Sequence, residues 1–207
     1  MRCIATLTTL SLSLGILSIA NLPANAKTIS SAPTNVNNVS PSSQLIAGSA
    51  SRAKLRDFLS RFGRSVDIQR LDTSEYPGQC VSLVARYLQE EYLGGSNQAL
   101  YLGNGGDVAR NVANQFSNHF SNIEDPADPI PGAIMSFPQI GGGYGHVAIV
   151  LNARRINGQL QVIIVDSNGD GKAGYGARIR GRRLIINTAN FSANGYGSGI
   201  VWVNPRD

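Results

Sequence analysis

The sequence predicts an α+β fold in which N-terminal helices pack on an antiparallel β-sheet of about five to six strands. Three segments with helical periodicity occupy residues 51–120, and short β-rich runs separated by glycine follow residue 125. Helices first and consecutive strands afterwards are typical of α+β proteins, and no helical crossover separates the strands as parallel βαβ units would require. The roughly 160 residues from residue 49 suit one domain with a single core.

The N-terminus is typical of a secretory signal peptide over residues 1–26. Arg2 precedes an uncharged apolar stretch that ends at about Ala20, and Ala24-Asn25-Ala26 is a small-x-small cleavage signal. The stretch is shorter than the roughly 20 strongly apolar residues of a membrane span. We therefore expect an exported chain with no integral membrane segment after cleavage; a retained N-terminal anchor is the alternative.

Composition and charge separate the next segment from the domain. Residues 27–48 are rich in Ser, Asn, Thr and Pro, which predicts a disordered spacer.

The chain carries a formal charge of +5, and cleavage after Ala26 leaves 17 basic and 13 acidic residues, a charge of +4. A basic exported protein suits an anionic partner such as nucleic acid, phospholipid or wall polymer, and charge alone does not choose among them.

Three segments have the spacing of amphipathic helices. In SRAKLRDFLSRF, Ser49 or Ser51 is placed to cap the start; VSLVARYLQEEYL is ended by Gly94-Gly95; and in DVARNVANQFSNHF the cap is Asp107. Each has one apolar face. The faces consist of Leu55, Phe58, Leu59 and Phe62, then Val81, Val84, Tyr87, Leu88 and Tyr92, then Val108, Val112, Phe116 and Phe120.

The second half contains the predicted strands. They follow the turn-rich boundary DPADPIPG and are AIMSF, HVAIVLNA, QLQVIIVD, ARIRGRRLIIN and GIVWVN. In the fourth run Arg178, Arg180 and Arg182 would share one face. A solvated edge is the favoured interpretation of these arginines, and an anion-binding stripe is the alternative.

The position of Cys80 suggests a reactive thiol. Cleavage would leave it as the only cysteine, so it cannot form an intrachain disulfide, and burial as an inert hydrophobe is its ordinary explanation. It is expected, however, in the first turn of the second helix, where free N–H groups and the helix dipole stabilise a thiolate. The preceding Pro77-Gly78 turn and the Gln79 amide would supply donors near a developing oxyanion.

Two histidines are available as a general base. His119 lies near the end of the third helix without an acidic neighbour, and we interpret it as an ordinary surface histidine. His146 opens a strand after GGGYG, where small residues leave room for a substrate, and it is the better base. Asp166 and Asn168, two residues apart at the end of the next strand, are the candidates to orient its imidazole.

The hairpin between these two strands offers a test. A two-residue Asn157-Gly158 turn would send Asp166 and Asn168 to the opposite face from His146. A three-residue loop over 156–158 with a G1 bulge would instead place Asn168 opposite His146 and Asp166 one diagonal away. A catalytic arrangement requires the three-residue loop, or a bulge within the hairpin, because only these place the polar residues on the same face as His146.

The same segment has a rival interpretation as a metal loop. The stretch from Asp166 to Gly171 fits the start of an EF-hand-type calcium loop, but Ala177 stands where the bidentate Glu belongs. A polar turn is therefore favoured, and we expect neither a metal nor a cofactor.

Together these motifs resemble the cysteine, histidine-dependent amidohydrolase/peptidase (CHAP) domains, papain-like enzymes that cut peptidoglycan. The resemblance covers roughly residues 70–170. Ala133 stands where the family commonly has Asp, and Asp166 where it commonly has Glu. The matching motifs are Gly78-Gln79-Cys80, Gly103-Asn104, Pro131-Gly132-Ala133-Ile134, Gly145-His146-Val147-Ala148-Ile149-Val150 and Asp166-x-Asn168.

The resemblance implies a papain-like catalytic domain over 49–207. In it Cys80 is the nucleophile, His146 the base and then the acid, Asp166 with Asn168 the orienting pair, and Gln79 part of the oxyanion region. The implied function is a secreted, periplasmic or wall-associated cysteine peptidase or N-acetylmuramoyl-L-alanine amidase, acting on peptidoglycan amides through a thioester. We expect a monomer without a nucleic-acid partner. A non-catalytic wall-binding module of the same fold is the alternative, and an acyl transferase is a third.

Overall fold

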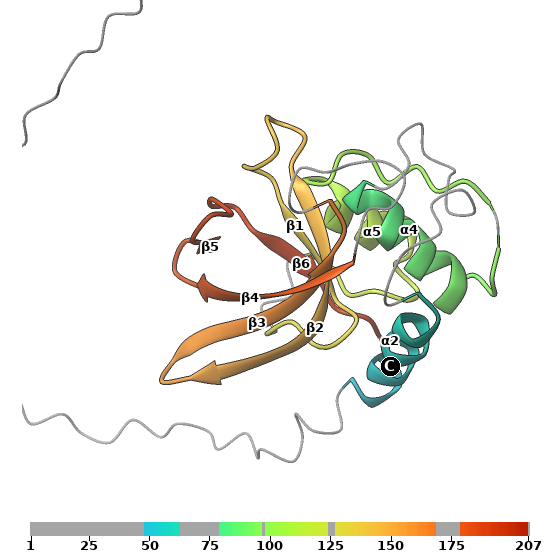
Figure 1. Cartoon of the computed structure of the whole chain (residues 1–207), viewed down its shortest axis with the longest axis horizontal. Coiled ribbons are helices and arrows are strands. Elements are labelled where there is room, and N and C mark those ends of the chain that lie inside the picture. Colours follow the sequence, from blue (N-terminus) through green and yellow to red (C-terminus); the bar gives the residue numbers. More distant parts are fainter. Residues whose placement is uncertain (1–47, 63–78, 97, 124–126, 169–178, 207) are drawn as a thin grey trace, which may run out of the picture. The chain divides into compact units, whose positions relative to one another are not determined.

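A computed structural model describes residues 48–62, 79–96, 98–123, 127–168 and 179–206, which form an α+β domain (Figure 1). The predicted signal peptide and nearly all of the predicted spacer lie outside these residues. The helices precede the strands, as predicted. The elements are α2 (Ser49–Phe62), α4 (Cys80–Glu91), α5 (Val108–Gln115), β1 (Ile134–Phe137), β2 (His146–Ile156), β3 (Gln159–Asp166), β4 (Arg180–Asn187), β5 (Ser192–Ala193) and β6 (Val201–Val203).

The helices form where apolar residues recur at helical spacing, and they pack on one another and on the sheet. Helix α2 packs against α4, α4 packs against β2, and α5 packs against β1 and β6 (Figure 1). Phe58 of α2 and Tyr87 of α4 meet edge to face, with ring centroids 5.3 Å apart. Both side chains are fully buried, so this contact holds the two helices together.

The helix ends differ from the predictions. Helix α2 begins at Ser49, so neither Ser49 nor Ser51 precedes it as a cap. Asp107 precedes α5, but its side chain makes no capping hydrogen bond. Helix α5 ends at Gln115 rather than near Phe120, because Phe120 pairs with Pro205 in an isolated β-bridge that a continuing helix would prevent.

Within the described residues the strands form one antiparallel sheet of six, in the order β5-β4-β3-β2-β1-β6. All five predicted runs contain a strand; β5, only two residues long, was not predicted. One face of the sheet packs against the helices through residues such as Val147, Ile149 and Val165. The other face has its own apolar cluster, which includes Ala148, Val150 and Ile164.

The β2–β3 hairpin contains a bulge that shifts the pairing of its two strands by one residue. Its turn is the two-residue form, with Asn157 and Gly158 at φ 50° and 79° and Ile156 paired with Gln159. That register holds as far as Asn152 and then shifts by one residue at Leu151. Beyond the shift, Val150 pairs with Ile164 and Ile149 with Val165.

The bulge decides on which face the polar residues at the strand ends lie. Side chains two residues apart in a strand share a face, so His146 lies on the same face as Val150. Ile164 pairs with Val150, and Asp166 lies on the same face as Ile164. His146 and Asp166 therefore lie on the same face. Of the arrangements compatible with a catalytic site, the protein uses the bulge and not the three-residue loop.

No helix within the described ranges combines the length and the apolar character that a bilayer crossing requires.

Candidate active site

Cys80 is the first residue of α4 and is a free thiol, 6% exposed. The residue before it, Gln79, is the N-cap and has an extended backbone at φ −71° and ψ 161°. Its carbonyl accepts a hydrogen bond from the amide of Ser82 at 3.0 Å. The thiol therefore lies at the positive end of the helix dipole, as predicted, where an anionic sulfur is favoured.

His146 is the first residue of β2 and lies beside Cys80 and Asp166. Its Nε2 lies 2.9 Å from Oδ2 of Asp166, the last residue of β3. Cys80 is also close enough to the ring to raise its pKa through hydrogen bonding and charge. Because Asp166 occupies Nε2, Nδ1 is the ring nitrogen available to the sulfur. Asp166 is only 1% exposed, so the carboxylate acts on the ring with little screening by solvent.

The surroundings of His146 keep its imidazole protonated. Burial is the largest single influence and lowers its pKa, but the hydrogen bonds with Asp166 and Cys80 and the charges of those groups together raise the pKa to about 9. The imidazolium therefore persists through neutral pH and loses its proton only near pH 9. A positive ring next to the sulfur favours a thiolate, which is the nucleophilic form of cysteine.

Asn168 contacts Gln79 and not the imidazole. Its Nδ2 donates to Oε1 of Gln79 at 2.5 Å, and the neighbouring Ser167 hydroxyl donates to the Gln79 carbonyl at 3.0 Å. Asn168 adopts φ 58°, a left-handed conformation that asparagine tolerates better than most residues. With Oε1 occupied, the Nε2 group of Gln79 remains available as a donor. Of the two candidates, Asp166 thus orients the ring, while Asn168 holds Gln79.

Two further residues at the site were not among the predicted site residues. Arg182 of β4 donates from Nε to Oδ1 of Asp166 at 3.3 Å and lies at the same distance from Oδ2, so it pairs with the carboxylate that holds His146. Tyr196 packs against Phe137 with centroids 4.6 Å apart and approaches the His146 ring at 6.5 Å. Arg182 was noted in the sequence only as part of a basic stripe, and Tyr196 has no motif that would have identified it.

Burial, followed by the negative charge of Asp166, raises the pKa of the Tyr196 phenol, although Arg182 opposes that effect. The phenol therefore stays neutral around the site. It can shield one side of the imidazole from water without adding a charge there.

His119 lies away from this group. It follows α5 and its ring is beside Tyr92, with centroids 5.6 Å apart. Tyr92 is at the opposite end of α4 from Cys80, and the helix rise puts about 18 Å between the two positions. His119 therefore cannot serve the thiol.

The glycines near His146 have a different use from the predicted one. Gly145 was expected to leave room for a substrate, but its backbone contacts Gly106 so closely that a side chain would overlap it. Gly105 is packed against the His146 backbone in the same way, and the amide of Gly106 donates to the Tyr144 carbonyl at 3.1 Å. Within the GGGYG segment, Gly142 and Gly143 are the glycines with open space beside them. Backbone contact between the loop that contains Gly105 and Gly106 and the loop that ends at Gly145 therefore positions His146.

Gly105→Ala should destabilise the fold and displace His146. The added methyl group would lie 2.8 Å from the His146 Cα, closer than real Cβ contacts come, and the obstacle is backbone that cannot rotate away. We expect a loss of about 1–3 kcal/mol in the free energy of unfolding, measured by denaturant titration.

Gly181→Ala is the matched control, because Gly181 has no positive φ and its new methyl group would meet only the Ile164 carbonyl at 3.9 Å. The two variants differ in the position of the methyl group and not in its size. Equal stabilities would show that the contact between the loops does not constrain His146.

The fold and the site define an α+β protein with a helix-start cysteine beside a histidine and an aspartate. Residues 71–168 match the CHAP domain family model. This match supports the resemblance to CHAP domains, and it suggests a hydrolase of the amidase or peptidase type, directed at peptidoglycan in general terms. No curated protein and no solved structure matched the chain.

The described residues contain no group of three or more His, Cys, Asp or Glu side chains able to hold a metal ion. Asp166 and Asn168, the first residues of the calcium-loop pattern, are engaged by His146 and Gln79. Asp170 and Ala177 lie outside the described residues.

Proposed function

We propose that the protein is an exported cysteine amidohydrolase or endopeptidase that hydrolyses amide bonds of peptidoglycan through a thioester. The observation that carries the proposal is the contact of His146 with both Cys80 and Asp166, three residues from three different elements. A merely packed cysteine needs no imidazole beside it, and a surface histidine needs no buried carboxylate.

In the proposed acylation step, the Cys80 thiolate attacks the carbonyl carbon of the scissile amide. Negative charge moves to the carbonyl oxygen, where the N–H groups at the start of α4 and the Gln79 side-chain amide would stabilise it. His146 then donates its proton to the amide nitrogen as the C–N bond breaks, which releases an amine and leaves a thioester on Cys80.

In the proposed deacylation step, neutral His146 takes a proton from water, and the resulting hydroxide attacks the thioester carbonyl. The C–S bond breaks, the carboxylic acid leaves and Cys80 returns as a thiolate beside protonated His146. Asp166 keeps the ring in one orientation through both steps. Arg182 balances the negative charge of the Asp166 carboxylate when the ring is neutral.

The substrate bond is either the muramoyl to L-alanine amide or a peptide bond in the stem or cross-bridge. Purified peptidoglycan should be digested with the protein and the released fragments identified by mass spectrometry. We expect new amino termini and no new reducing sugars; an amidase would expose L-alanine, and an endopeptidase would expose a residue within the peptides. Binding without release of fragments would instead indicate a wall-binding module, and amine adducts would indicate an acyl transferase.

A further inference from the structure

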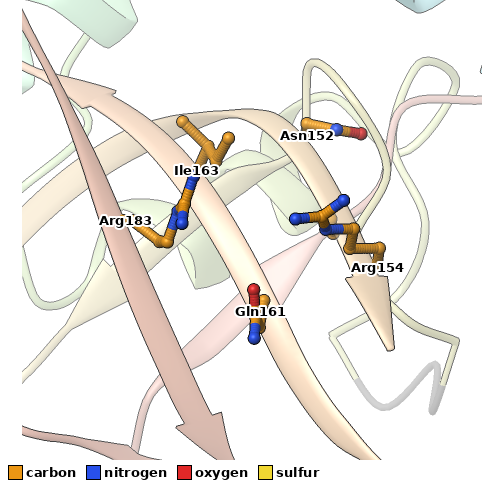
Figure 2. A pocket seen from close by; sticks show the side chains of 6 residues that line it. Asn152, Arg154, Gln161, Ile163 and Arg183 are labelled. Carbon is orange, nitrogen blue, oxygen red and sulfur yellow. The ribbon is translucent and has the colours of Figure 1, made fainter. Parts of the chain in front are cut away.

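A second group of polar side chains lies on the other face of the sheet from Asp166. Side chains alternate along β3, so Gln161 and Ile163 face away from the side that carries Asp166. With their cross-strand neighbours they line a pocket of about 130 Å³. Figure 2 shows it between β2 and β4, and its lining residues are Asn152, Ala153, Arg154, Gln161, Ile163 and Arg183.

The polar side chains of this pocket have no partner among the described residues. The side chains of Arg154, Arg183, Asn152 and Gln161 make no hydrogen bond or ion pair within the described part of the chain. The next residue in sequence, Arg155, differs from them, because its Nε and Nη2 contact the Asp128 carboxylate at 2.8 and 2.7 Å. The pocket therefore holds unused hydrogen-bonding capacity as well as unbalanced positive charge.

The arrangement of the arginines suits an oxyanion. They come from the two strands that flank β3 and extend toward it from opposite sides (Figure 2). Two guanidinium groups directed to one place repel each other, and an anion between them would remove that repulsion while accepting paired N–H groups. The two amides beside them can pair with peptide or hydroxyl groups next to such an anion.

An apolar surface adjoins the charged one. Ile163 lines the pocket, and Ile185, the partner of Gln161 in β4, is 51% exposed on the same face. Single exposed aliphatic residues are common on protein surfaces, but these two stand where the methyl groups of a ligand held by the arginines could contact them. A peptide with methyl groups and a free carboxylate has both.

We propose that this pocket binds a free carboxylate of a peptidoglycan stem peptide, at a site separate from the one that contains Cys80. The inference rests on the proposed function for the identity of the polymer. Gln161 lies five residues before Asp166 along β3, which is about 17 Å toward the β2–β3 turn. A carboxylate bound in the pocket is therefore not at the bond being cleaved. The pocket tethers the protein to the polymer and raises the local concentration of scissile bonds at Cys80.

The test measures binding of the full chain to purified peptidoglycan sacculi in the Cys80→Ala background, where no cleavage occurs. We expect Arg154→Ala combined with Arg183→Ala to weaken binding by about threefold to thirtyfold, as loss of two exposed ion pairs predicts. The matched control combines Arg56→Ala and Arg110→Ala, two exposed helix arginines whose loss removes the same charge. An equal effect of the control pair would show that binding depends on the overall positive charge and not on the pocket, which would overturn the proposal.

Two treatments of the sacculi identify the anion. Amidation of the carboxylates with carbodiimide and an amine should abolish the difference between the pocket variant and its parent. Hydrofluoric acid, which strips phosphodiester-linked polymers, should leave that difference intact. Loss of the difference only after hydrofluoric acid would assign the pocket to phosphate and contradict the carboxylate proposal.

The binding test and the function test fail separately. If sacculi binding depends on Arg154 and Arg183 but the unmodified chain releases no fragments, the tether stands and hydrolysis is wrong. If fragments are released and binding is unaffected, the tether alone is wrong.

Discussion

Cys80→Ala is expected to reduce the release of peptidoglycan fragments by about 10⁴-fold or more, because the variant has no atom that can form the thioester. The thiol is small and already buried, so its loss leaves only a minor cavity in a well-packed part of α4. The circular dichroism spectrum and thermal midpoint should therefore change little. The measurement is mass spectrometry of soluble fragments from sacculi incubated with matched concentrations of both proteins.

Cys80→Ser is the control for this substitution. It replaces the sulfur with a smaller hydroxyl oxygen, and a neutral hydroxyl cannot form the ion pair with His146 that a thiolate forms. We expect it to be almost as inactive as Cys80→Ala. Fragment release by Cys80→Ala at a tenth of the unmodified rate or more would remove the thiol from the mechanism.

Asp166→Ala is expected to lower fragment release by about 10²–10³-fold. The substitution removes the acceptor that holds Nε2 of His146, and it also removes the charge that helps to keep the imidazole protonated. It leaves Arg182 without this carboxylate, so stability should also fall. Asp166→Asn keeps an oxygen that can accept from Nε2 and should recover part of the activity.

Asn168→Ala is the comparison that separates the two roles. Asn168 contacts Gln79, so its loss should free the Gln79 amide to rotate and should lower fragment release by about tenfold through a poorer oxyanion site. The pKa of His146, followed by NMR titration, should fall in Asp166→Ala and stay near its original value in Asn168→Ala. The reverse pattern would assign the orienting role to Asn168.

The strands were the most predictable elements, because alternating or continuous β-rich runs bounded by glycine leave few other structures open to them. Helix α5 was less so: Phe116 and Phe120 continue the apolar spacing, yet the bridge between Phe120 and Pro205 ends the helix early. That bridge joins residues 85 positions apart, which local periodicity does not report.

The site was predictable in its residues more than in its geometry. Cys80 and His146 could be identified because each stands at the start of an element next to small residues. Whether Asp166 faces the imidazole depends on the bulge at Leu151. The sequence around Leu151 contains no glycine or other feature that marks a bulge. Arg182 and Tyr196 reach the site from later segments, so only the folded sheet shows that they belong to it.

The account depends above all on the pairing of the Cys80 thiol with protonated His146. The most direct test is the rate of alkylation of Cys80 by iodoacetamide at pH 7, followed by peptide mapping, in the unmodified chain and in His146→Ala. We expect the unmodified chain to react at least about tenfold faster, and the difference to shrink at pH 10, because the pKa of His146 is about 9 and the ring is neutral there. Equal rates at pH 7 would show that the imidazole does not activate the thiol and would contradict the proposed mechanism.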